Sequence, residues 1–390
     1  MTNETHTPQE QPALNQPLSP QPPAQAPLQP PYDVQQPYGA QLPQQPYGAQ
    51  QFQQPPVPPQ NFVPFPSHTS LRRDIMSTCL TVLAFILTIQ LGAGVLGAIL
   101  MLAAEGPSNF LNETDVTSLI GKHIDLIMVA QLIAMTCGLA WFFLIRGKKF
   151  LTTDITKRNA SPRASGIFEL IALMFGIQFS TVLLAMLAET ILRPAGLSAT
   201  DSMDSSVMMM LSSPLGILYV VLIGPIIEEL AFRGAVMRKL EPYGANFAIV
   251  TSSILFGLYH LILFQAVFAF FAGLIFAYAA GRYSLKWALL LHILNNLLAT
   301  LTVLLPRALT MLPQDAAEEI VGMGFIALYF VGFVVAIVLL VVKRDSFKAQ
   351  KVAGAPVLPR VFKTAYSHPA FIVYVSLTVL FGLVSVAVGL

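Results

Sequence analysis

The sequence predicts an all-α polytopic membrane protein, with about nine transmembrane helices after a disordered, Pro/Gln-rich N-terminal tail. Composition is the first indication: of 390 residues, 55% are hydrophobic and only 11% are charged, whereas a soluble domain has roughly 25% charged residues. The second is that the apolar residues form long runs, each near the ~20 residues that a helix needs to cross a bilayer. The third is that residues 1–68 contain no Lys or Arg and no apolar run.

The tail is rich in Pro and Gln, and it contains the heptapeptide Gln-Gln-Pro-Tyr-Gly-Ala-Gln at 35–41 and again at 44–50. Such a segment buries too little apolar surface to offset its chain entropy, so we expect residues 1–68 to be disordered with polyproline character. Docking to a partner that binds polyproline and an inert tail are both compatible with this composition.

From Leu71 onward the apolar runs define the remaining organisation. We expect N-terminal transmembrane helices in 69–206, a helical core with the chemically active residues in 207–305, and C-terminal transmembrane helices in 306–390. The predicted spans are 75–104, 125–145, 165–192, 207–232, 244–264, 265–283, 286–305, 321–342 and 369–390.

Basic residues predict the orientation, because cytoplasmic loops of membrane proteins carry an excess of Lys and Arg. With the N-terminus in the cytoplasm, 19 of the 22 Lys and Arg residues fall on the inner side, and only Lys122, Arg193 and Arg307 fall outside. An odd number of spans then places the C-terminus outside. We expect a multi-pass protein of a bacterial plasma membrane, with the lipid bilayer as its environment and no nucleic-acid partner.

The fourth predicted span contains Glu228, Glu229 and Arg233 in a stretch that is otherwise nearly all apolar. Ionisable groups in a membrane helix are costly, so they are read first as functional. Glu228 lies about 14 residues before the predicted turn at 242–244 and His260 about 17 after it. At ~1.5 Å per residue both reach a similar depth. A carboxylate and an imidazole can therefore face each other across an antiparallel helix pair.

Two further pairs have the spacing that brings side chains onto one helix face. His292 and Asn296 are four residues apart, as are Phe256 and His260. On straight helices, however, His292 would lie about 9 Å lower than His260. Helix tilt, a re-entrant sixth span or a deep inner turn would each close this gap. Asn295 is the alternative to Asn296, but it points about 100° away from the face of His292.

The motifs Glu-Glu-x-x-x-Arg, Phe-x-x-x-His and His-x-x-x-Asn thus occur in this order on separate apolar segments within 207–305. In this the chain resembles the CPBP family of intramembrane proteases, which includes the type II CAAX prenyl endopeptidases and bacterial proteins of bacteriocin processing and self-immunity. The resemblance implies an intramembrane endopeptidase acting on a membrane-associated peptide or protein. We expect cleavage near the cytoplasmic face.

Carried over to this sequence, the resemblance implies a role for each motif residue. Glu228 is the general base, and His260 helps to orient and activate the attacking water. His292 and Asn296 stabilise the oxyanion, a contribution of about 3 kcal/mol per donor where water is scarce. Glu229 and Arg233 pair and fix the helix geometry, and Phe256 supports His260.

The family is described as metalloproteases, although a metal-free, glutamate-dependent mechanism has also been argued for it. Glu228, His260 and His292 have the ligand types of a catalytic site for Zn²⁺ or another divalent metal. The His-Glu-x-x-His signature of zinc proteases is absent from the sequence. The sequence leaves a metal-dependent and a glutamate-dependent mechanism both open.

Other interpretations compete with the protease. A proton- or cation-coupled transporter also uses buried Glu and His on several helices. Transporters with internal repeats often show broken helices in two matching halves, and here Gly224-Pro225 is one such interruption without a second copy. A third interpretation is a scaffold with a degenerate site, whose tail recruits a partner.

Overall fold

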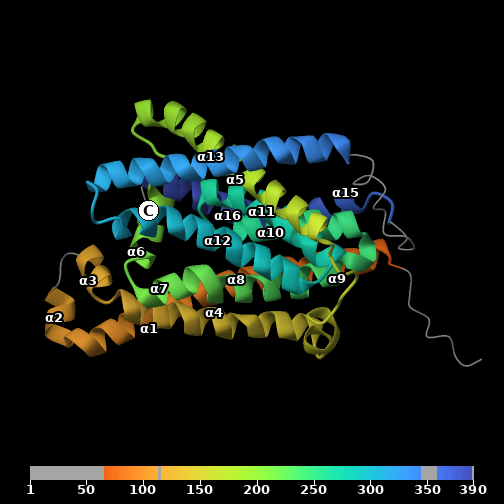
Figure 1. Cartoon of the computed structure of the whole chain (residues 1–390). Helices are drawn as coiled ribbons and strands as arrows, with labels where there is room; N and C mark the ends of the chain where they lie inside the picture. Colours follow the sequence, from red (N-terminus) through yellow and green to blue (C-terminus); the bar gives the residue numbers. More distant parts are fainter. Residues whose placement is uncertain (1–65, 113–115, 344–357, 389–390) are drawn as a thin grey trace, which may run out of the picture. The chain divides into compact units, whose positions relative to one another are not determined.

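The computed structural model describes residues 66–112, 116–343 and 358–388 (Figure 1). Within these ranges the protein is helical, without a β-strand apart from one isolated bridge between Arg158 and Ser284. The predicted all-α class is therefore confirmed. All but the last three residues of the tail that we expected to be disordered lie outside the described ranges.

Eight helices in the described part of the chain are long and apolar enough to cross a membrane. One of them, Pro214–Tyr243, is continuous but changes its hydrogen-bonding register several times. The eight are α1 (His68–Glu105), α4 (Ile124–Arg146), α5 (Ala164–Leu192, extended by η2, Arg193–Ala195), the run Pro214–Tyr243, α11 (Leu263–Arg282), α12 (Leu285–Ala308), α13 (Gln314–Val342) and α16 (Pro369–Val388).

The run Pro214–Tyr243 consists of six short segments: α7 (Pro214–Leu218), η3 (Tyr219–Ile223), α8 (Gly224–Glu229), η4 (Leu230–Met237), α9 (Arg238–Leu240) and η5 (Glu241–Tyr243). Both η3 and η4 are π-helical. The remaining short helices are α2 (Pro107–Asn112), α3 (Val116–Lys122), η1 (Phe150–Asp154), α6 (Asp201–Met210), α10 (Ala245–Tyr259) and α15 (Val361–Tyr366).

The fourth span begins later than predicted. Residues 207–210 belong to α6, a separate helix, and the chain turns before the span starts at Pro214. Ser213 is the N-cap of this span, because its hydroxyl accepts hydrogen bonds from the backbone N–H groups of Leu215 and Gly216. Hydropathy alone predicted one continuous span over both segments, because Met208, Met209 and Met210 are as apolar as the helix that follows.

The fifth predicted span, 244–264, is shorter than the sequence suggested. Helix α10 has 15 residues, or about 22 Å of rise, which is less than the ~30 Å of a bilayer core. The chain reverses at Leu261, a non-glycine residue with φ of 62°, and α11 runs back beside α10. A Cβ on Gly257 would lie 2.5 Å from the carbonyl oxygen of Ala266, so this tight reversal requires glycine there.

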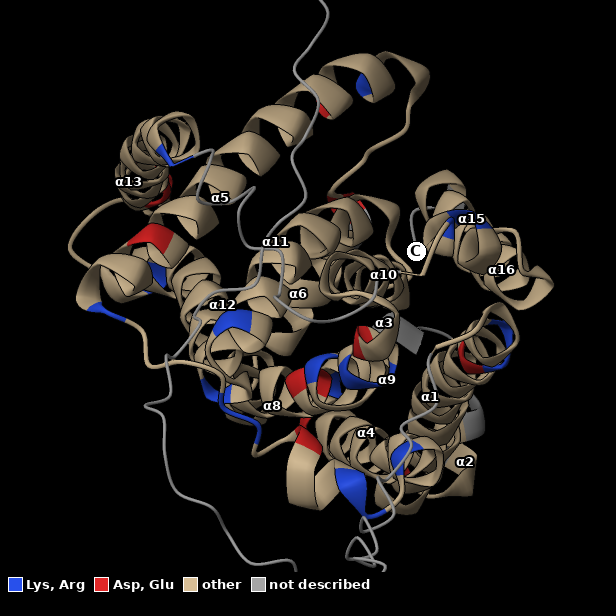
Figure 2. Ribbon diagram, turned by 90° about the vertical axis from the view of Figure 1, so that its right-hand side faces the viewer, with Lys and Arg blue, Asp and Glu red and all other residues tan. Residues whose placement is uncertain are grey.

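The helical unit has two chemically different ends. We call the end that contains 147–163, 241–244 and 283–284 the basic end, because most of the described Lys and Arg residues gather there (Figure 2). The opposite end contains 106–112, 116–123, 196–213 and 309–313 and carries Lys122, Arg193 and Arg307. The predicted orientation also counted Arg344, Lys348 and Lys351, which lie outside the described residues.

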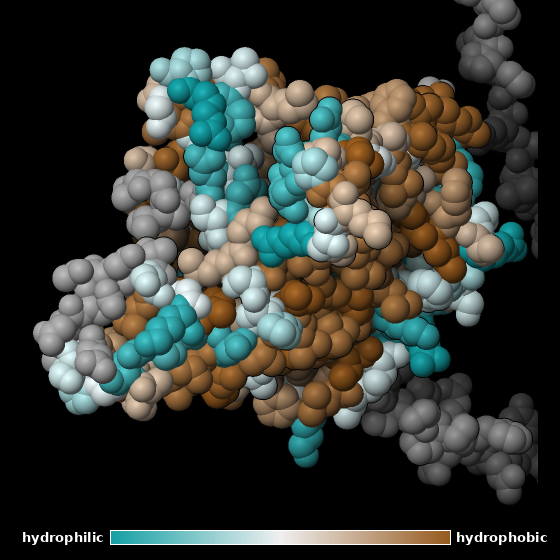
Figure 3. Space-filling model, turned by 60° about the vertical axis from the view of Figure 1, so that its left-hand side comes forward, coloured by the Kyte–Doolittle hydropathy of each residue, from teal (hydrophilic) through white to brown (hydrophobic). Residues whose placement is uncertain are grey.

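Several charged groups at the basic end are paired with one another. Arg146 donates two hydrogen bonds of 2.7 Å to Asp154, Arg238 contacts Glu241 at 2.6 Å, and Lys343 pairs with Glu169. Between the two ends the surface is largely apolar (Figure 3). Large side chains such as Leu91 of α1 and Val331 of α13 are at least 60% exposed there, as expected for residues that face lipid tails.

Candidate active site

Glu228 and Glu229 end α8, and Arg233 follows in the π-helix η4. Arg233 Nη1 donates to Glu229 Oε1 at 2.9 Å, and both side chains are almost fully buried. The structure therefore contains the i, i+4 pair that the sequence predicted. Because a buried charge without a partner is costly, each member requires the other.

Arg233 is held by two more groups from neighbouring helices. Its Nη2 donates to the carbonyl oxygen of Gly273 at 3.1 Å, and its guanidinium lies 4.2 Å above the Phe256 ring, a favourable cation–π distance. A Cβ on Gly273 would lie 3.0 Å from Arg233 Nη2 and 3.1 Å from Phe256. Glycine at this position lets α11 approach closely enough to accept that hydrogen bond.

His292 joins the same network from α12. Its Nδ1 lies 3.0 Å from Glu229 Oε1, so Nδ1 carries a proton and donates it to the carboxylate, which can only accept when ionised. Its Nε2 then faces Glu228 Oε2 at 3.7 Å, too long for a direct hydrogen bond. The ring of Phe276 stacks on the imidazole at 4.7 Å. His292 thus lies at the depth of Glu228 and Glu229.

His260 lies at the end of α10, where it is half-buried. Its Nδ1 is 2.9 Å from the carbonyl oxygen of Phe256. Because a carbonyl can only accept, Nδ1 must be the protonated nitrogen, and Nε2 keeps a lone pair when the ring is neutral. The Phe256 ring packs against His260 at 5.0 Å and against His292 at 5.7 Å. Phe256 therefore separates and supports both imidazoles.

Asn296 has a structural partner that the sequence did not reveal. Its Nδ2 donates to the carbonyl oxygen of Val220 at 2.9 Å. In η3 the N–H of Gly224 bonds to the carbonyl oxygen of Tyr219, so the next donor in this register would be Pro225, which has no N–H. Asn296 supplies the hydrogen bond that Pro225 cannot, and it keeps one further amide hydrogen.

The alternative residue, Asn295, is buried and faces α5. Gln178 Nε2 donates to Asn295 Oδ1 at 2.7 Å, and Asn295 Nδ2 donates to Asn296 Oδ1 at 3.2 Å. This second bond fixes the amide of Asn296 with its nitrogen toward Val220. The predicted 100° offset between the two asparagines is consistent with these separate partners.

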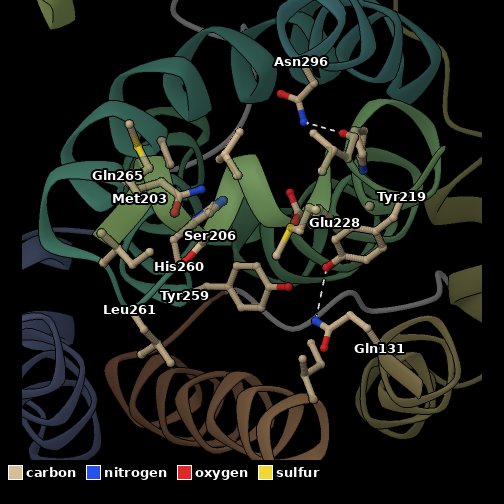
Figure 4. A pocket seen from close by; sticks show the side chains of 18 of the residues that line it. Gln131, Met203, Ser206, Tyr219, Glu228, Tyr259, His260, Leu261, Gln265 and Asn296 are labelled. Atoms are coloured by element: carbon tan, nitrogen blue, oxygen red, sulfur yellow. Dashed lines mark hydrogen bonds between the residues drawn. The ribbon is translucent and has the colours of Figure 1, made fainter. Parts of the chain in front are cut away.

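A cavity of about 740 Å³ is lined by Glu228, His260, His292 and Asn296 together (Figure 4). It brings side chains of α8, the α10–α11 turn and α12 to one polar space. Glu229 and Arg233 lie behind this wall, where Glu229 contacts His292 and Arg233 contacts the ring of Phe256, and both of these residues line the cavity. The seven predicted residues thus form one connected group, in which His260 and Asn296 contact the others through Phe256 and the backbone of η3.

Sequence reasoning missed the polar residues that complete the wall. Tyr219 and Tyr259 project into the cavity beside Glu228, and Gln131 Nε2 donates to the Tyr219 hydroxyl at 3.3 Å (Figure 4). Gln265 lines the cavity from the first turn of α11. An amide in a membrane span is a weak signal of such a site, and Gln131 and Gln265 carried that signal.

The residues fit a metal poorly in this arrangement. Across the described ranges no three His, Cys, Asp or Glu side chains gather as a metal-binding group. A catalytic zinc site uses three protein ligands around one point, whereas His260 and His292 reach the cavity from different helical segments, each packed against the ring of Phe256. We therefore assign no step to a metal.

Residues 210–298 match the family described as Rce1-like, type II CAAX prenyl endopeptidase. The matched segment contains all three motifs, from Glu228 to Asn296. It supports a CPBP-type domain of an intramembrane CAAX-type endopeptidase, in a multi-pass membrane protein. No curated protein and no solved structure matches the chain.

Proposed function

Starting from the Rce1-like match of residues 210–298, we propose that this chain is a glutamate-dependent endopeptidase. It hydrolyses one peptide bond of a membrane-associated peptide or protein inside the bilayer. The observation that carries the proposal is the single cavity to which Glu228, His260 and His292 come from three separate helical segments. The substrates that we propose are prenylated proteins, as in the family description, and amphipathic peptides.

In the proposed reaction, Glu228 Oε2 accepts a proton from a water molecule that lies between it and the two imidazoles. His260 Nε2, which has a lone pair, accepts the second hydrogen bond of that water and orients it. The hydroxide equivalent forms a bond to the carbonyl carbon of the substrate. General-base assistance of this kind contributes about 10²–10⁴-fold in rate.

The tetrahedral intermediate carries its negative charge on the former carbonyl oxygen. The remaining amide hydrogen of Asn296 and a protonated Nε2 of His292 are the proposed donors to this oxyanion. Glu229 stabilises that protonated form, because its carboxylate accepts from Nδ1 of the same ring. Glu228 then donates the proton to the leaving nitrogen as the C–N bond breaks, which leaves one new carboxylate and one new amine.

The test is cleavage of a membrane-peptide library by the full-length protein in proteoliposomes. We expect Glu228→Gln and His260→Ala to lose at least about 100-fold of the rate. The matched control is Glu169→Gln on α5, which removes a carboxylate paired with Lys343 at the basic end and should leave the rate unchanged. Loss of activity in the control as well, or full activity of Glu228→Gln, would refute the assignment.

The same vesicles also test the competing transporter. Uptake of a proton or cation by wild-type protein, with no cleavage of any library member, would favour transport over hydrolysis. Cleavage without uptake supports the peptidase.

A further inference from the structure

The short helix α10 determines where the cavity lies along the bundle. Because α10 stops after 15 residues and the chain reverses at Leu261, α10 itself ends well short of the length of the other spans. The reversal itself lines the cavity through Tyr259, His260 and Leu261. The cavity therefore borders the place where α10 ends.

Part of the remaining wall comes from segments toward the opposite end. Met203 and Ser206 of α6, Ile124 and Ile127 in the first turn of α4, and Phe381 near the end of α16 all line the cavity. Among the residues lining it, none belongs to η1, α9 or α15, which lie at the basic end.

Between the cavity and the basic end, the interior is filled by packed side chains. From Glu228 toward the basic end, the helical run Pro214–Tyr243 continues through Phe232, Arg233 and Val236. The side chains of these three residues have no exposed surface. Phe232 packs edge-on against Phe256 at 5.2 Å and lies 6.3 Å from Phe142. Arg238 then covers this layer by donating to the carbonyl oxygen of Ala280 at 3.1 Å. A peptide could not reach the carboxylates from that end without displacing this packed layer.

We propose that the substrate enters from the end opposite to the basic residues, which is the extracytoplasmic side by the positive-inside rule. The inference rests on the proposed peptidase and narrows its substrates to extended peptides that are displayed or secreted outside the membrane. Methionines at 203, 209 and 210 line the entry, and their flexible side chains adapt to varied apolar groups. This route differs from the expectation of cleavage near the cytoplasmic face.

The test is thiol accessibility of the full-length protein in a bacterial inner membrane, and it needs no catalysis. In a Cys137→Ala background, which retains only the buried Cys79, single cysteines are introduced as Gln265→Cys and, separately, Gln131→Cys. Met311→Cys marks the opposite end, where Met311 is 99% exposed, and Lys148→Cys marks the basic end. A membrane-impermeant maleimide is applied to spheroplasts and to inside-out vesicles.

We expect spheroplasts to label both cavity cysteines together with Met311→Cys, at least tenfold faster than inside-out vesicles do. Lys148→Cys should show the reverse. Labelling of the cavity cysteines from the cytoplasmic side would overturn the proposal. So would no label from either side when the detergent-unfolded proteins react fully. Because Glu228→Gln should label in the same way as the wild-type background, failure of the entry route is distinguishable from failure of the proposed chemistry.

Discussion

Replacing Asn296 tests whether this side chain stabilises the helix, the reaction or both. Asn296 donates to the carbonyl oxygen of Val220 at 2.9 Å because Pro225 offers no N–H in the π-helical register. Asn296→Ala leaves that carbonyl without a donor. Pro225→Ala restores a backbone N–H at the position where the register requires one, so it should replace the lost hydrogen bond.

The two changes form a double-mutant cycle. A hydrogen bond between membrane helices is worth about 0.6 kcal/mol on average and up to about 1.7, and an unsatisfied acceptor costs about 1–3 kcal/mol. Asn296→Ala alone should therefore reduce the free energy of unfolding by about 1 kcal/mol. In the Pro225→Ala background the same change should cost a few tenths of that, because the carbonyl of Val220 has another donor.

The assay is denaturant unfolding of the four proteins in the same detergent, together with the rate of peptide cleavage. An equal loss of stability in both backgrounds would refute the account of Pro225. The cleavage rate decides the second role: if Asn296 also donates to the oxyanion, activity should stay at least about 100-fold reduced in the double variant. Recovery of activity with recovery of stability would make Asn296 a positioning residue only.

Three further predictions concern the scaffold around the site and its chemistry. Arg233→Met should reduce stability by about 3–5 kcal/mol, because it leaves the Glu229 carboxylate buried without its cation; Lys157→Met, at a surface pair, should change thermal unfolding little. Gly257→Ala should lower the melting temperature and the cleavage rate, since its Cβ would meet a backbone oxygen at 2.5 Å at a cost of about 1–3 kcal/mol. The control Gly281→Ala meets its nearest atom at 4.0 Å and should behave as wild type. A chelator should leave cleavage intact, and a loss that added zinc reverses would contradict the metal-free mechanism.

The sequence by itself determined the helical class, most span positions and the pair Glu229–Arg233. These follow from hydropathy and from i, i+4 spacing, which depend on neighbouring residues only. The same reasoning placed His292 and Asn296 on one face of a single helix. It could also anticipate the offset of Asn295 from that face, because the geometry of an α-helix fixes that angle, but not that Asn295 would line the same cavity.

The tertiary structure alone decided where those faces meet and how deep they lie. Hydropathy could not show that α10 stops at Tyr259, because the residues that follow, Leu261–Phe264, are equally apolar. It could not show that Asn296 serves the carbonyl of Val220, because this depends on the π-helical register and on the approach of α12. The position of the cavity follows from one shortened helix, and helix length inside an apolar run is set by packing against other helices.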